Sequence, residues 1–551
     1  MTKPALQIIP LGGLGEVGKN MMMFQYGTEA IIVDTGLMFP ENDMLGIDYI
    51  IPDFRHLTHR DDLNVRGIIV THGHEDHTGA IQHVAAAFQA PIYATPLTRG
   101  LLEVKLKQAH LLDHLEMVTF RAGDTLDISP FSVETFHVCH SIPDGVGLGI
   151  NTPVGMIVHS GDFKFDHTPV DNWPPDFARL AQFASRGVLA LLSDSTNADH
   201  PGWTPSEAVI DAAFDRVFRA APGRIIVATF ASLISRIQQV ATAARRYNRK
   251  MAVAGHTMSD NIKMAVNLGY LELSPDLMIS IDEAKKLDPK EVVIMATGTQ
   301  GEPSAVLGRL AIGKHHQLAI QPGDTVIMSA HPIPGNEEGV HRTINRLFQR
   351  GANVIYDPIE QVHVSGHASQ EEQKLLINLV RPKYFIPIHG ELRHLRQHAR
   401  LAEQVGIPPE NIAVVENGTI LSFDENGVLT LGERVPGGYV FVDGAGVGDI
   451  GPAVIRDRET LARDGIVIVN VKVDSTTHEC INAPEIVSRG FVFHRESDTL
   501  MDNARETVKR ILSQNPEANG RKQEMVQEAL RKMFYNETKR RPLIFAFINE
   551  V

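Results

Sequence analysis

The stretch Thr-His-Gly-His-Glu-Asp-His-Thr-Gly, at residues 71–79, decides how this sequence is interpreted. It follows the apolar run Gly-Ile-Ile-Val at residues 67–70, which is typical of a buried strand. Four side chains on this turn can bind a metal: His72, His74, Asp76 and His77. Imidazole and carboxylate together suit Zn²⁺ or Mn²⁺, and so many ligands on one turn indicate two adjacent cations. The alternative, a polar turn with exposed histidines, explains this spacing less well.

Working outward from that turn, the chain shows short strands and helices. Helical spacing occurs at residues 79–89, directly after the histidines. Strand-like runs lie at residues 6–11, 30–34, 131–138, 154–159 and 188–193. Several of these runs end in Asp, Gly or His, so the strand ends carry the polar groups. The pattern predicts a layered α/β protein.

The pattern of expected helices and strands changes at Ser206. Residues 206–365 alternate helices and strands, which predicts a second α/β unit with a parallel sheet. From residue 366 the sequence is again rich in histidines and strand-like runs, as in the first domain. We therefore expect residues 206–365 to be inserted into the first domain. The expected organisation is a split first domain at 1–205 and 366–432, a Gly-rich linker at 433–464 and a small α+β domain at 465–551. In the last domain we expect strands at 466–473 and 543–548 and a long helix at 499–533.

The length, net charge and composition of the chain limit the classes of protein to which it can belong. The chain has 551 residues, a formal net charge of -14 and two cysteines, Cys139 and Cys480. At roughly 100–200 residues per domain this length predicts about three domains. An apolar run long enough for a membrane span, a secretory leader and a disulfide framework are all missing from the sequence, so we expect a cytoplasmic protein with no membrane partner. The acidic balance argues against nucleic-acid binding over the whole surface but leaves room for a local basic groove.

The motif His-x-His-x-Asp-His after a strand resembles the metallo-β-lactamase superfamily. The resemblance implies an αββα sandwich for the first domain, with further ligands at later strand ends. It implies two ligand sets bridged by Asp162: His72, His74 and His140 for one cation, and Asp76, His77 and His389 for the other. Asp34 matches an early Asp of the family, which orients the histidine turn. Cys139 is adjacent to His140, so on a strand it faces away from the metals and is expected to be a buried thiol.

The inserted unit resembles the β-CASP insertion of nucleic-acid nucleases in the same superfamily. Three motif positions match: Asp194, His367 and His389. The resemblance implies catalytic roles for His367, Asp194 and Asp76. His367 would contact the scissile phosphate or assist the leaving oxygen, or would only cap a helix. Asp194 would anchor a histidine or be a turn residue. A His at 389 is typical of members that cut RNA, whereas relatives that cut DNA tend to have Val.

Four further segments are similar to the bacterial ribonuclease J family: residues 11–20, 39–48, 297–303 and the C-terminal domain. The resemblance implies a 5′→3′ exonuclease that prefers a 5′-monophosphate, together with an endonuclease, both acting on single-stranded RNA. A hydroxide bridging two cations would attack the phosphodiester. It also implies roles in mRNA decay and rRNA maturation, a homodimer or tetramer, and RNA-degradation complexes as partners.

A pocket for the 5′-phosphate needs small hydroxyls and free backbone N–H groups near a helix start. Two strand-to-helix turns fit, although both are also ordinary helix caps. The candidate residues are Ser232, Leu233, His363, Val364, Ser365, Gly366, His367, Ala368 and Ser369. The basic run Arg236, Arg245, Arg246, Arg249 and Lys250 either lines the RNA path or is a solvated face.

Two other sequence patterns resemble binding sites but also have ordinary structural explanations. Gly46, Asp48 and Asp443 match positions where relatives carry a structural cation, for which oxygen ligands would suit Ca²⁺, or they are surface residues. Residues 13–18 read G-x-G-x-x-G, but a strand-like run follows, so we expect a Gly-rich turn and no dinucleotide site.

Two other functions compete with a dinuclear-metal ribonuclease. A DNA-directed nuclease of the same fold is one, and His389 argues against it. A non-catalytic RNA-binding scaffold is the other, and a broken ligand set would be its signature. The sequence has a candidate for every ligand position.

Overall fold

The structure is a computed structural model that describes residues 4–41, 43–333, 336–477, 479–492, 498–515 and 521–551. The chain divides into two compact units. The larger contains Met1–Phe39 and Ile50–Val440, and the smaller contains Pro40–Tyr49 and Phe441–Val551.

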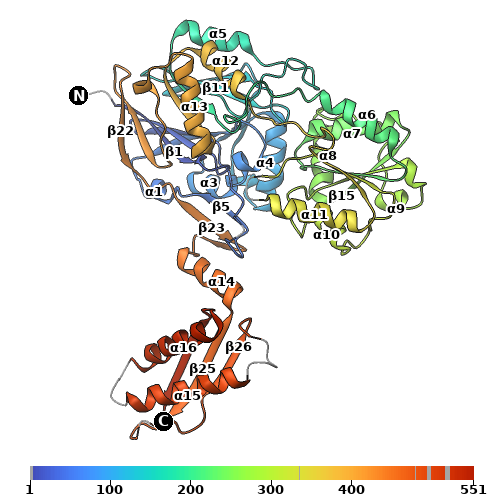
Figure 1. Ribbon diagram of the computed structural model, residues 1–551. Coiled ribbons are helices and arrows are strands. Elements are labelled where there is room, and N and C mark those ends of the chain that lie inside the picture. The colour runs from blue at the N-terminus through green and yellow to red at the C-terminus, as the bar shows by residue number, and fades with distance from the viewer. Residues whose placement is uncertain (1–3, 42, 334–335, 478, 493–497, 516–520) are drawn as a thin grey trace. The chain divides into compact units, whose positions relative to one another are not determined.

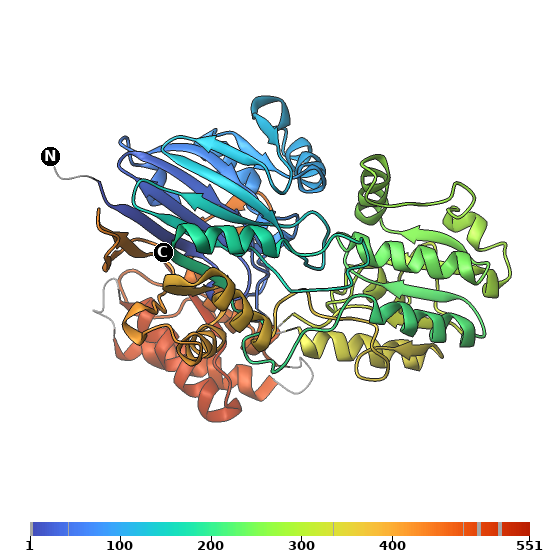
Figure 2. The ribbon, with the colours of Figure 1, turned by 90° about the horizontal axis from the view of Figure 1, so that it is seen from above.

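The larger unit is built on two sheets that pack face to face (Figure 2). The first has eight strands, in the spatial order β22 (Leu429–Arg434), β21 (Thr419–Phe423), β1 (Leu6–Gly12), β3 (Met21–Tyr26), β4 (Glu29–Val33), β6 (Asn64–Ile69), β7 (Ile92–Ala94) and β8 (Met117–Thr119). The second has six, in the order β19 (Pro382–Ile388), β13 (Val188–Asp194), β12 (Met156–His159), β11 (Val146–Asn151), β10 (Phe131–His137) and β9 (Thr125–Ile128).

Helices cover the outer faces of both sheets (Figure 1). On the six-stranded sheet lie α5 (Phe177–Arg186), α12 (Gln370–Val380) and α13 (Leu392–Gln404). Near the eight-stranded sheet lie α1 (Arg55–Thr58), α2 (Glu75–Thr78), α3 (Ile81–Phe88) and α4 (Pro96–Gln108). Leu6, Phe24 and Ile31 from one sheet meet Leu148 and Ile386 from the other in a dry core. This is the expected αββα sandwich.

The inserted lobe is a separate five-stranded sheet whose neighbouring strands are all parallel. Its spatial order is β15 (Lys250–Ala254), β16 (Val292–Ala296), β14 (Ile225–Ala228), β17 (Thr325–Met328) and β18 (Asn353–Ile355). Its helices are α6 (Val209–Ala220), α7 (Ile234–Arg246), α8 (His256–Asn267), α9 (Ile281–Ala284), α10 (Val306–Ile312) and α11 (Glu337–Gln349). Apolar clusters lie on both faces of the sheet, so its strands are buried on both sides, as the sequence predicts.

The Gly-rich turn at residues 13–18 runs into β3, a strand, as expected. Within it, β2 (Leu14–Gly15) pairs with β20 (Gly390–Glu391). The turn therefore lies beside the segment that carries His389.

The core of the smaller unit is a three-stranded sheet that packs against two helices (Figure 1). Its strands, in spatial order, are β26 (Glu485–Arg489), β25 (Ile466–Val473) and β27 (Leu543–Glu550). The expected long helix is two helices, α15 (Asp498–Gln514) and α16 (Lys522–Thr538). Residues 516–520 of the expected helix lie outside the described residues, and the helical pattern of the sequence ran over Pro516, a helix breaker.

The expected linker at 433–464 carries regular structure. It contains β23 (Tyr439–Asp443), β24 (Gly446–Val447) and α14 (Pro452–Asp464). The short strand β5 (Tyr49–Pro52) lies near the start of the chain. Among the described helices, none has the length and apolarity that a membrane crossing requires.

Candidate metal centre

The carboxyl ends of five strands lie at one edge of the sandwich. β12, β13 and β19 are parallel neighbours, and Asp162, Asp194 and His389 lie at or just after their carboxyl ends. β4 and β6 are parallel neighbours in the facing sheet, and each is followed by part of the site. Asp34 follows β4, and residues 71–79 follow β6. Because parallel strands end at the same edge, side chains far apart in the sequence meet there.

Three imidazoles form the first group. His72 Nε2 lies 3.1 Å from His74 Nδ1, and His74 Nδ1 lies 3.0 Å from His140 Nε2. In a tetrahedral site with metal–nitrogen bonds of about 2.0–2.1 Å, ligand nitrogens lie roughly 3.3 Å apart. The three nitrogens are therefore spaced as ligands of one cation.

Hydrogen bonds to the other ring nitrogens fix the ligating atoms. His140 Nδ1 donates to the carbonyl of Gly366 at 2.7 Å, which leaves the lone pair on Nε2. His72 Nδ1 lies 3.1 Å from the hydroxyl of Thr71. Such partners orient metal-binding histidines and set the tautomer.

Carboxylates and imidazoles together form the second group: Asp76, His77, Asp162 and His389. Asp162 Oδ2 lies 3.2 Å from His77 Nε2 and 3.6 Å from His72 Nε2, so it stands between the two groups. His389 Nε2 lies 3.3 Å from Asp76 Oδ2. The two groups of candidate ligands therefore lie on either side of the Asp162 carboxylate.

Two buried polar atoms indicate that this site can bind cations. Asp162 Oδ2 and His389 Nε2 are buried, and neither has a hydrogen-bond partner in the part of the chain that the structure describes. A buried polar atom without a partner costs about 1–3 kcal/mol, more if it is charged. A cation between the two groups would satisfy both atoms. The donor set of imidazole and carboxylate fits a divalent metal, and the structure therefore supports divalent metal binding.

Asp34 orients the histidine turn, as the resemblance implies. Its carboxylate accepts from His77 Nδ1 at 2.8 Å and from the Thr71 backbone N–H at 2.8 Å. Asp34 and His389 both have positive φ, at 62° and 52°. Non-glycine residues in this conformation cost about 1–3 kcal/mol and cluster at functional sites.

Burial and neighbouring charge separate the histidines into two electrostatic classes. Burial lowers the pKa of His72 and His140 well below the ordinary value, and that of His74 to about 4. Although burial opposes it, the carboxylate of Asp162 raises the pKa of His77 and of His389 well above the ordinary value. The first group is therefore neutral without metal, whereas the second holds protons.

Asp194 holds His367 at the rim of the site. His367 Nδ1 lies 2.8 Å from Asp194 Oδ2, while Thr196 satisfies the other carboxylate oxygen through its N–H and hydroxyl. Burial lowers the pKa of His367, but the Asp194 carboxylate outweighs it and raises that pKa. The helix-cap alternative for His367 fails, because Ser369 caps α12.

The predicted phosphate loop, residues 363–369, alternates its side chains. His363, Ser365 and His367 are partly exposed, whereas Val364, Gly366, Ala368 and Ser369 are buried. Ser365 Oγ accepts from Asn197 Nδ2 at 2.8 Å. Only the side chains of His363, Ser365 and His367 can therefore contact a ligand.

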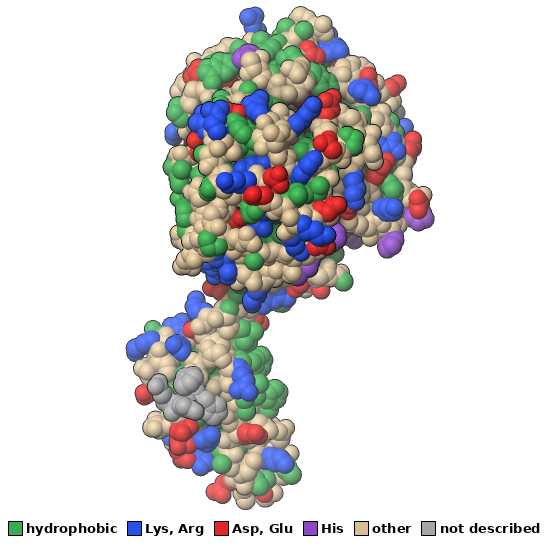
Figure 3. Space-filling model, turned by 90° about the vertical axis from the view of Figure 1, so that its right-hand side faces the viewer, with side chains coloured by type: hydrophobic (Ala, Val, Ile, Leu, Met, Phe, Trp, Pro, Cys, Tyr) green, Lys and Arg blue, Asp and Glu red, His purple; other side chains and the backbone are tan. Residues whose placement is uncertain are grey.

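The facing turn places Leu233 inside the lobe and leaves Ser232 partly exposed. Two residues of the basic run nearby, Arg236 and Arg249, are engaged inside the protein. Arg236 is buried and pairs with Glu207 at 2.6 Å, and Arg249 is buried and donates to Gly223 O. Figure 3 shows cationic and anionic side chains interspersed over this side of the inserted lobe.

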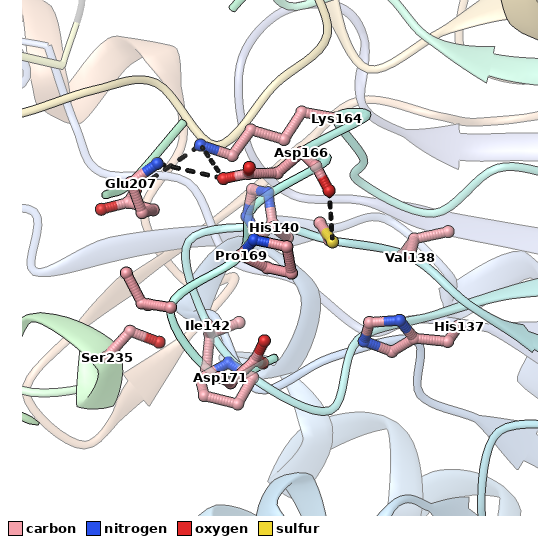
Figure 4. A pocket seen from close by; sticks show the side chains of 13 residues that line it. His137, Val138, His140, Ile142, Lys164, Asp166, Pro169, Asp171, Glu207 and Ser235 are labelled. Atoms are coloured by element: carbon pink, nitrogen blue, oxygen red, sulfur yellow. Dashed lines mark hydrogen bonds and ion pairs between the residues drawn. The ribbon is translucent and has the colours of Figure 1, made fainter. Parts of the chain in front are cut away.

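A charged cluster lies behind His140, where the sandwich meets the inserted lobe (Figure 4). Lys164 Nζ lies 3.8 Å from both Asp166 Oδ2 and Glu207 Oε1, beside a cavity of about 20 Å³. Cys139 is buried here, and burial raises the pKa of its thiol to about 12. The thiol is therefore inert, as expected, and the cluster ties the two parts together.

The proposed structural-cation residues have other partners. Asp443 Oδ2 accepts from Arg458 Nη2 at 2.6 Å, and Asp48 Oδ2 accepts from the Gly444 N–H at 2.8 Å. A Cβ on Gly46 would meet Arg458 Nη1 at 2.7 Å. The Arg458 guanidinium therefore lies beside these residues, and a structural cation bound by Gly46, Asp48 and Asp443 stays a prediction.

Sequence reasoning missed four residues that support the site. Asn20 Nδ2 donates to the Asp76 carbonyl at 3.1 Å, and Asn197 and Thr204 both donate to the His367 carbonyl. Glu372 accepts from three backbone N–H groups. Single polar residues at scattered positions give no local signal, although Ser369-x-x-Glu372 is a capping box.

Known sequence families match four successive parts of the chain. Their descriptions are Metallo-beta-lactamase superfamily (residues 14–215), Ribonuclease J, beta-CASP domain (residues 222–347), Zn-dependent metallo-hydrolase RNA specificity domain (residues 351–413) and Ribonuclease J C-terminal domain (residues 453–551).

Curated proteins are similar over nearly the whole chain. Ribonuclease J2 of Bacillus subtilis is 43% identical over 551 residues, covering 99% of this chain and 99% of that protein. Ribonuclease J of Thermus thermophilus is 44% identical over 495 residues, covering 88% of this chain and 85% of that protein. A crystal structure of a protein of unknown function from Enterococcus faecalis V583 has a TM-score of 0.57 at 17% identity, covering 76% of this chain and 100% of that one. That likeness concerns the fold alone.

Proposed function

The chain belongs to the ribonuclease J family and is a hydrolytic ribonuclease, and from this premise we propose that it shortens single-stranded RNA from the 5′ end. We propose that it prefers a 5′-monophosphate and also cuts RNA internally. One observation carries the proposal: seven candidate ligands, Asp194 and His367 converge at one edge of the sandwich, next to the loop at residues 363–369.

The two ligand groups would hold two divalent cations, with Asp162 shared between them. His72, His74 and His140 would bind one, and Asp76, His77 and His389 the other. Zn²⁺ and Mn²⁺ both suit this donor set. Paired cations lower the pKa of water and neutralise phosphate oxygens, which is the chemistry that phosphodiester hydrolysis needs.

Side chains of the protein would supply the proton that the reaction needs. Asp194 orients His367 and raises its pKa, which favours the protonated imidazole. From the rim of the site it can donate to a phosphate oxygen or to the leaving oxygen. The 2.8 Å contact fixes which nitrogen faces the RNA, because Nδ1 is occupied by Asp194 and Nε2 is left for the substrate.

The 5′-phosphate would bind between two turns. Ser365 and His363 are partly exposed on one, and Ser232 is partly exposed on the other. Val364, Gly366, Ala368, Ser369 and Leu233 are buried, so they would contribute backbone groups or shape. A terminal phosphate held at a fixed distance from the cations would make cleavage proceed one nucleotide at a time.

The assembly and the cellular role are further proposals. One face of the C-terminal sheet is apolar and exposed: Ile468, Val487 and Phe545 lie in one cross-strand row, and Phe547 is next to them. A second copy of the chain would cover this face and form a homodimer. We place the enzyme in the cytoplasm, in mRNA decay and rRNA maturation, with RNA-degradation complexes as partners.

Cleavage of a 5′-monophosphorylated, 3′-labelled RNA tests the proposal. Metal-stripped protein is given Mn²⁺ or Zn²⁺ and compared with a His74→Ala variant and with a DNA strand of the same sequence. We expect mononucleotides from the RNA and at least a 100-fold lower rate for the variant, since one ligand of the first group is lost. Cleavage of DNA alone would move the enzyme to the DNA-directed branch, and binding without cleavage would favour a scaffold.

A further inference from the structure

A second cavity, of about 290 Å³, opens beside the metal centre. Its lining comes from two segments that meet where the sandwich passes into the inserted lobe: Phe165, Asp166, His167 and Thr168 from one, and Trp203, Thr204 and Ser206 from the other. None of these residues is among the candidate ligands or in the phosphate loop.

Three of the seven residues that line this cavity carry rings: Phe165, His167 and Trp203. Half of the Trp203 surface is exposed, so part of the indole is accessible to a ligand. The exposed ring of His167 lies 6.1 Å from that of Trp203 at 47°, and 5.9 Å from that of Phe177 at 24°. The rings form a platform that is open to one more planar group.

The polar side chains of Asp166, Thr204 and Ser206 in the walls are already hydrogen-bonded within the protein. Asp166 accepts from the N–H groups of Thr168 and Glu207, and Ser206 Oγ donates to the Thr168 carbonyl. Thr204 Oγ1 donates to the His367 carbonyl at 2.7 Å. Besides the His167 imidazole, the cavity therefore offers mainly ring faces, so it suits a flat ligand that is bound by stacking.

The wall is continuous with the proposed RNA site. The bond from Thr204 joins the residue after Trp203 to the backbone of His367, which is part of the phosphate loop. A ligand on the Trp203 ring would therefore sit a fixed distance from the reacting phosphate, outside the metal centre.

We propose that the Trp203 platform stacks a nucleobase of the single-stranded RNA away from the position that is cut, as a substrate-holding subsite without base specificity. The inference rests on the proposed function. Every base has a π-face, and base–aromatic stacking contributes about 1–3 kcal/mol of binding free energy per base. Such a subsite would therefore bind single-stranded RNA of any sequence. The same chemistry would accept a free mononucleotide, which the experiment separates.

Affinity measured without cleavage tests the proposal. Metal-stripped protein binds a 5′-monophosphorylated single-stranded RNA, and Trp203→Ala, Trp203→Phe and Trp173→Ala variants are compared. We expect Kd to rise about 10-fold for Trp203→Ala and less than 3-fold for Trp203→Phe, which keeps a ring. Trp173 is the matched control, because its ring already stacks on His137 at 3.9 Å, and its variant should bind like the unaltered protein.

Abasic substitutions at successive positions of the RNA locate the stacked base. One abasic position should weaken binding by the unaltered protein about 10-fold and add nothing to Trp203→Ala. The chain has two tryptophans, so Trp173→Phe leaves Trp203 as the sole tryptophan, and RNA should quench its fluorescence.

An unchanged Kd for Trp203→Ala, with the unaltered protein still cleaving RNA, would overturn this subsite and leave the proposed function intact. Quenching by AMP at the concentrations at which the RNA acts, without an abasic effect, would overturn it in favour of a free nucleotide. Failure of the unaltered protein to cleave or bind RNA would instead remove the proposed function.

Discussion

At the scale of single residues, hydrogen bonds made by each ring's second nitrogen decide which nitrogens can bind a cation. His140 shows the principle, because its Nδ1 is bound to the Gly366 carbonyl at 2.7 Å and its Nε2 points at His74. The sequence could predict His140 as a ligand from the family resemblance. It could not predict its acceptor, which lies 226 residues further along the chain.

Substituting Gly366 by Ala tests that contact. A Cβ there would lie 2.7 Å from the His140 ring and 2.9 Å from the Ser141 backbone nitrogen, so the ring must shift. We expect affinity for the cation of the first group to fall about 10- to 100-fold. Competition with a chelator of known affinity measures it. Gly438→Ala is the control, since its Cβ would meet nothing within 4 Å, and an equal loss there would refute the explanation.

The two classes of histidine predict a pH optimum for stability in metal-stripped protein. His72, His74 and His140 have lowered pKa values, so stability falls as the pH drops below the ordinary value of 6.5. His77 and His389 have raised pKa values, so their contribution is complete below 6.5 and is lost as the pH rises through those higher values.

Thermal unfolding between about pH 5 and pH 9 should therefore give a highest midpoint near 6.5 without metal. Added metal should remove the decline above that pH, because cations replace the protons on the second group. A midpoint that climbs steadily through pH 8 in metal-stripped protein would contradict the assignment of charge.

At the scale of elements, much of the site is predictable because strands end where the ligands begin. The runs before Asp34 and His72 are strands, as their apolar pattern predicts, and they become parallel neighbours. Helix α12 spans Gln370–Val380, directly after the phosphate loop, as expected. The basic run is different: Arg236 looks like a surface residue in the sequence, and its burial depends on Glu207 from another segment.

The fold of the last domain was harder to predict for a related reason. Helical periodicity continues on both sides of residues 516–520, so it does not locate the end of α15. Likewise the glycines of residues 433–464 indicated a linker, whereas β23 and α14 form there. Gly and Pro mark turns, but they do not exclude short elements between the turns.

The buried carboxylate of Glu372 should be a main support of the phosphate loop. It is fully buried and accepts from the N–H groups of Phe165, Thr204 and Ser369 at 2.7–2.9 Å. Glu372→Ala would leave three donors without an acceptor and should cost about 3–5 kcal/mol of unfolding free energy. Denaturant unfolding checks it. Glu371→Ala, an exposed neighbour paired with Lys374, should cost less than about 1 kcal/mol, and similar losses for both would be inconsistent with this role.

At the scale of the whole molecule, the C-terminal sheet carries the surface through which we propose that two copies of the chain assemble. Alternate residues of β25 are buried under α15 and α16, and the opposite face exposes Phe545 by 43% and Phe547 by 52%. Exposed aromatic rows of this kind mark interfaces.

Phe545→Glu should therefore convert a dimer into a monomer, because two carboxylates would be buried against apolar side chains. Light scattering with size-exclusion chromatography measures the mass. Phe348→Glu, at an equally exposed aromatic on α11, should leave the mass unchanged. A protein that is monomeric before substitution, or a dimer that survives Phe545→Glu, would refute the proposed interface.

The most direct test of the central claim is a metal titration followed by the rate of RNA cleavage. Metal-stripped protein at a known concentration receives Mn²⁺ or Zn²⁺ in fractions of an equivalent, and release of mononucleotides is recorded at each step. We predict no cleavage without metal and a rate that becomes maximal at two equivalents per chain, because both ligand groups must be filled. Full activity at one equivalent, or in the presence of excess chelator, would contradict the account.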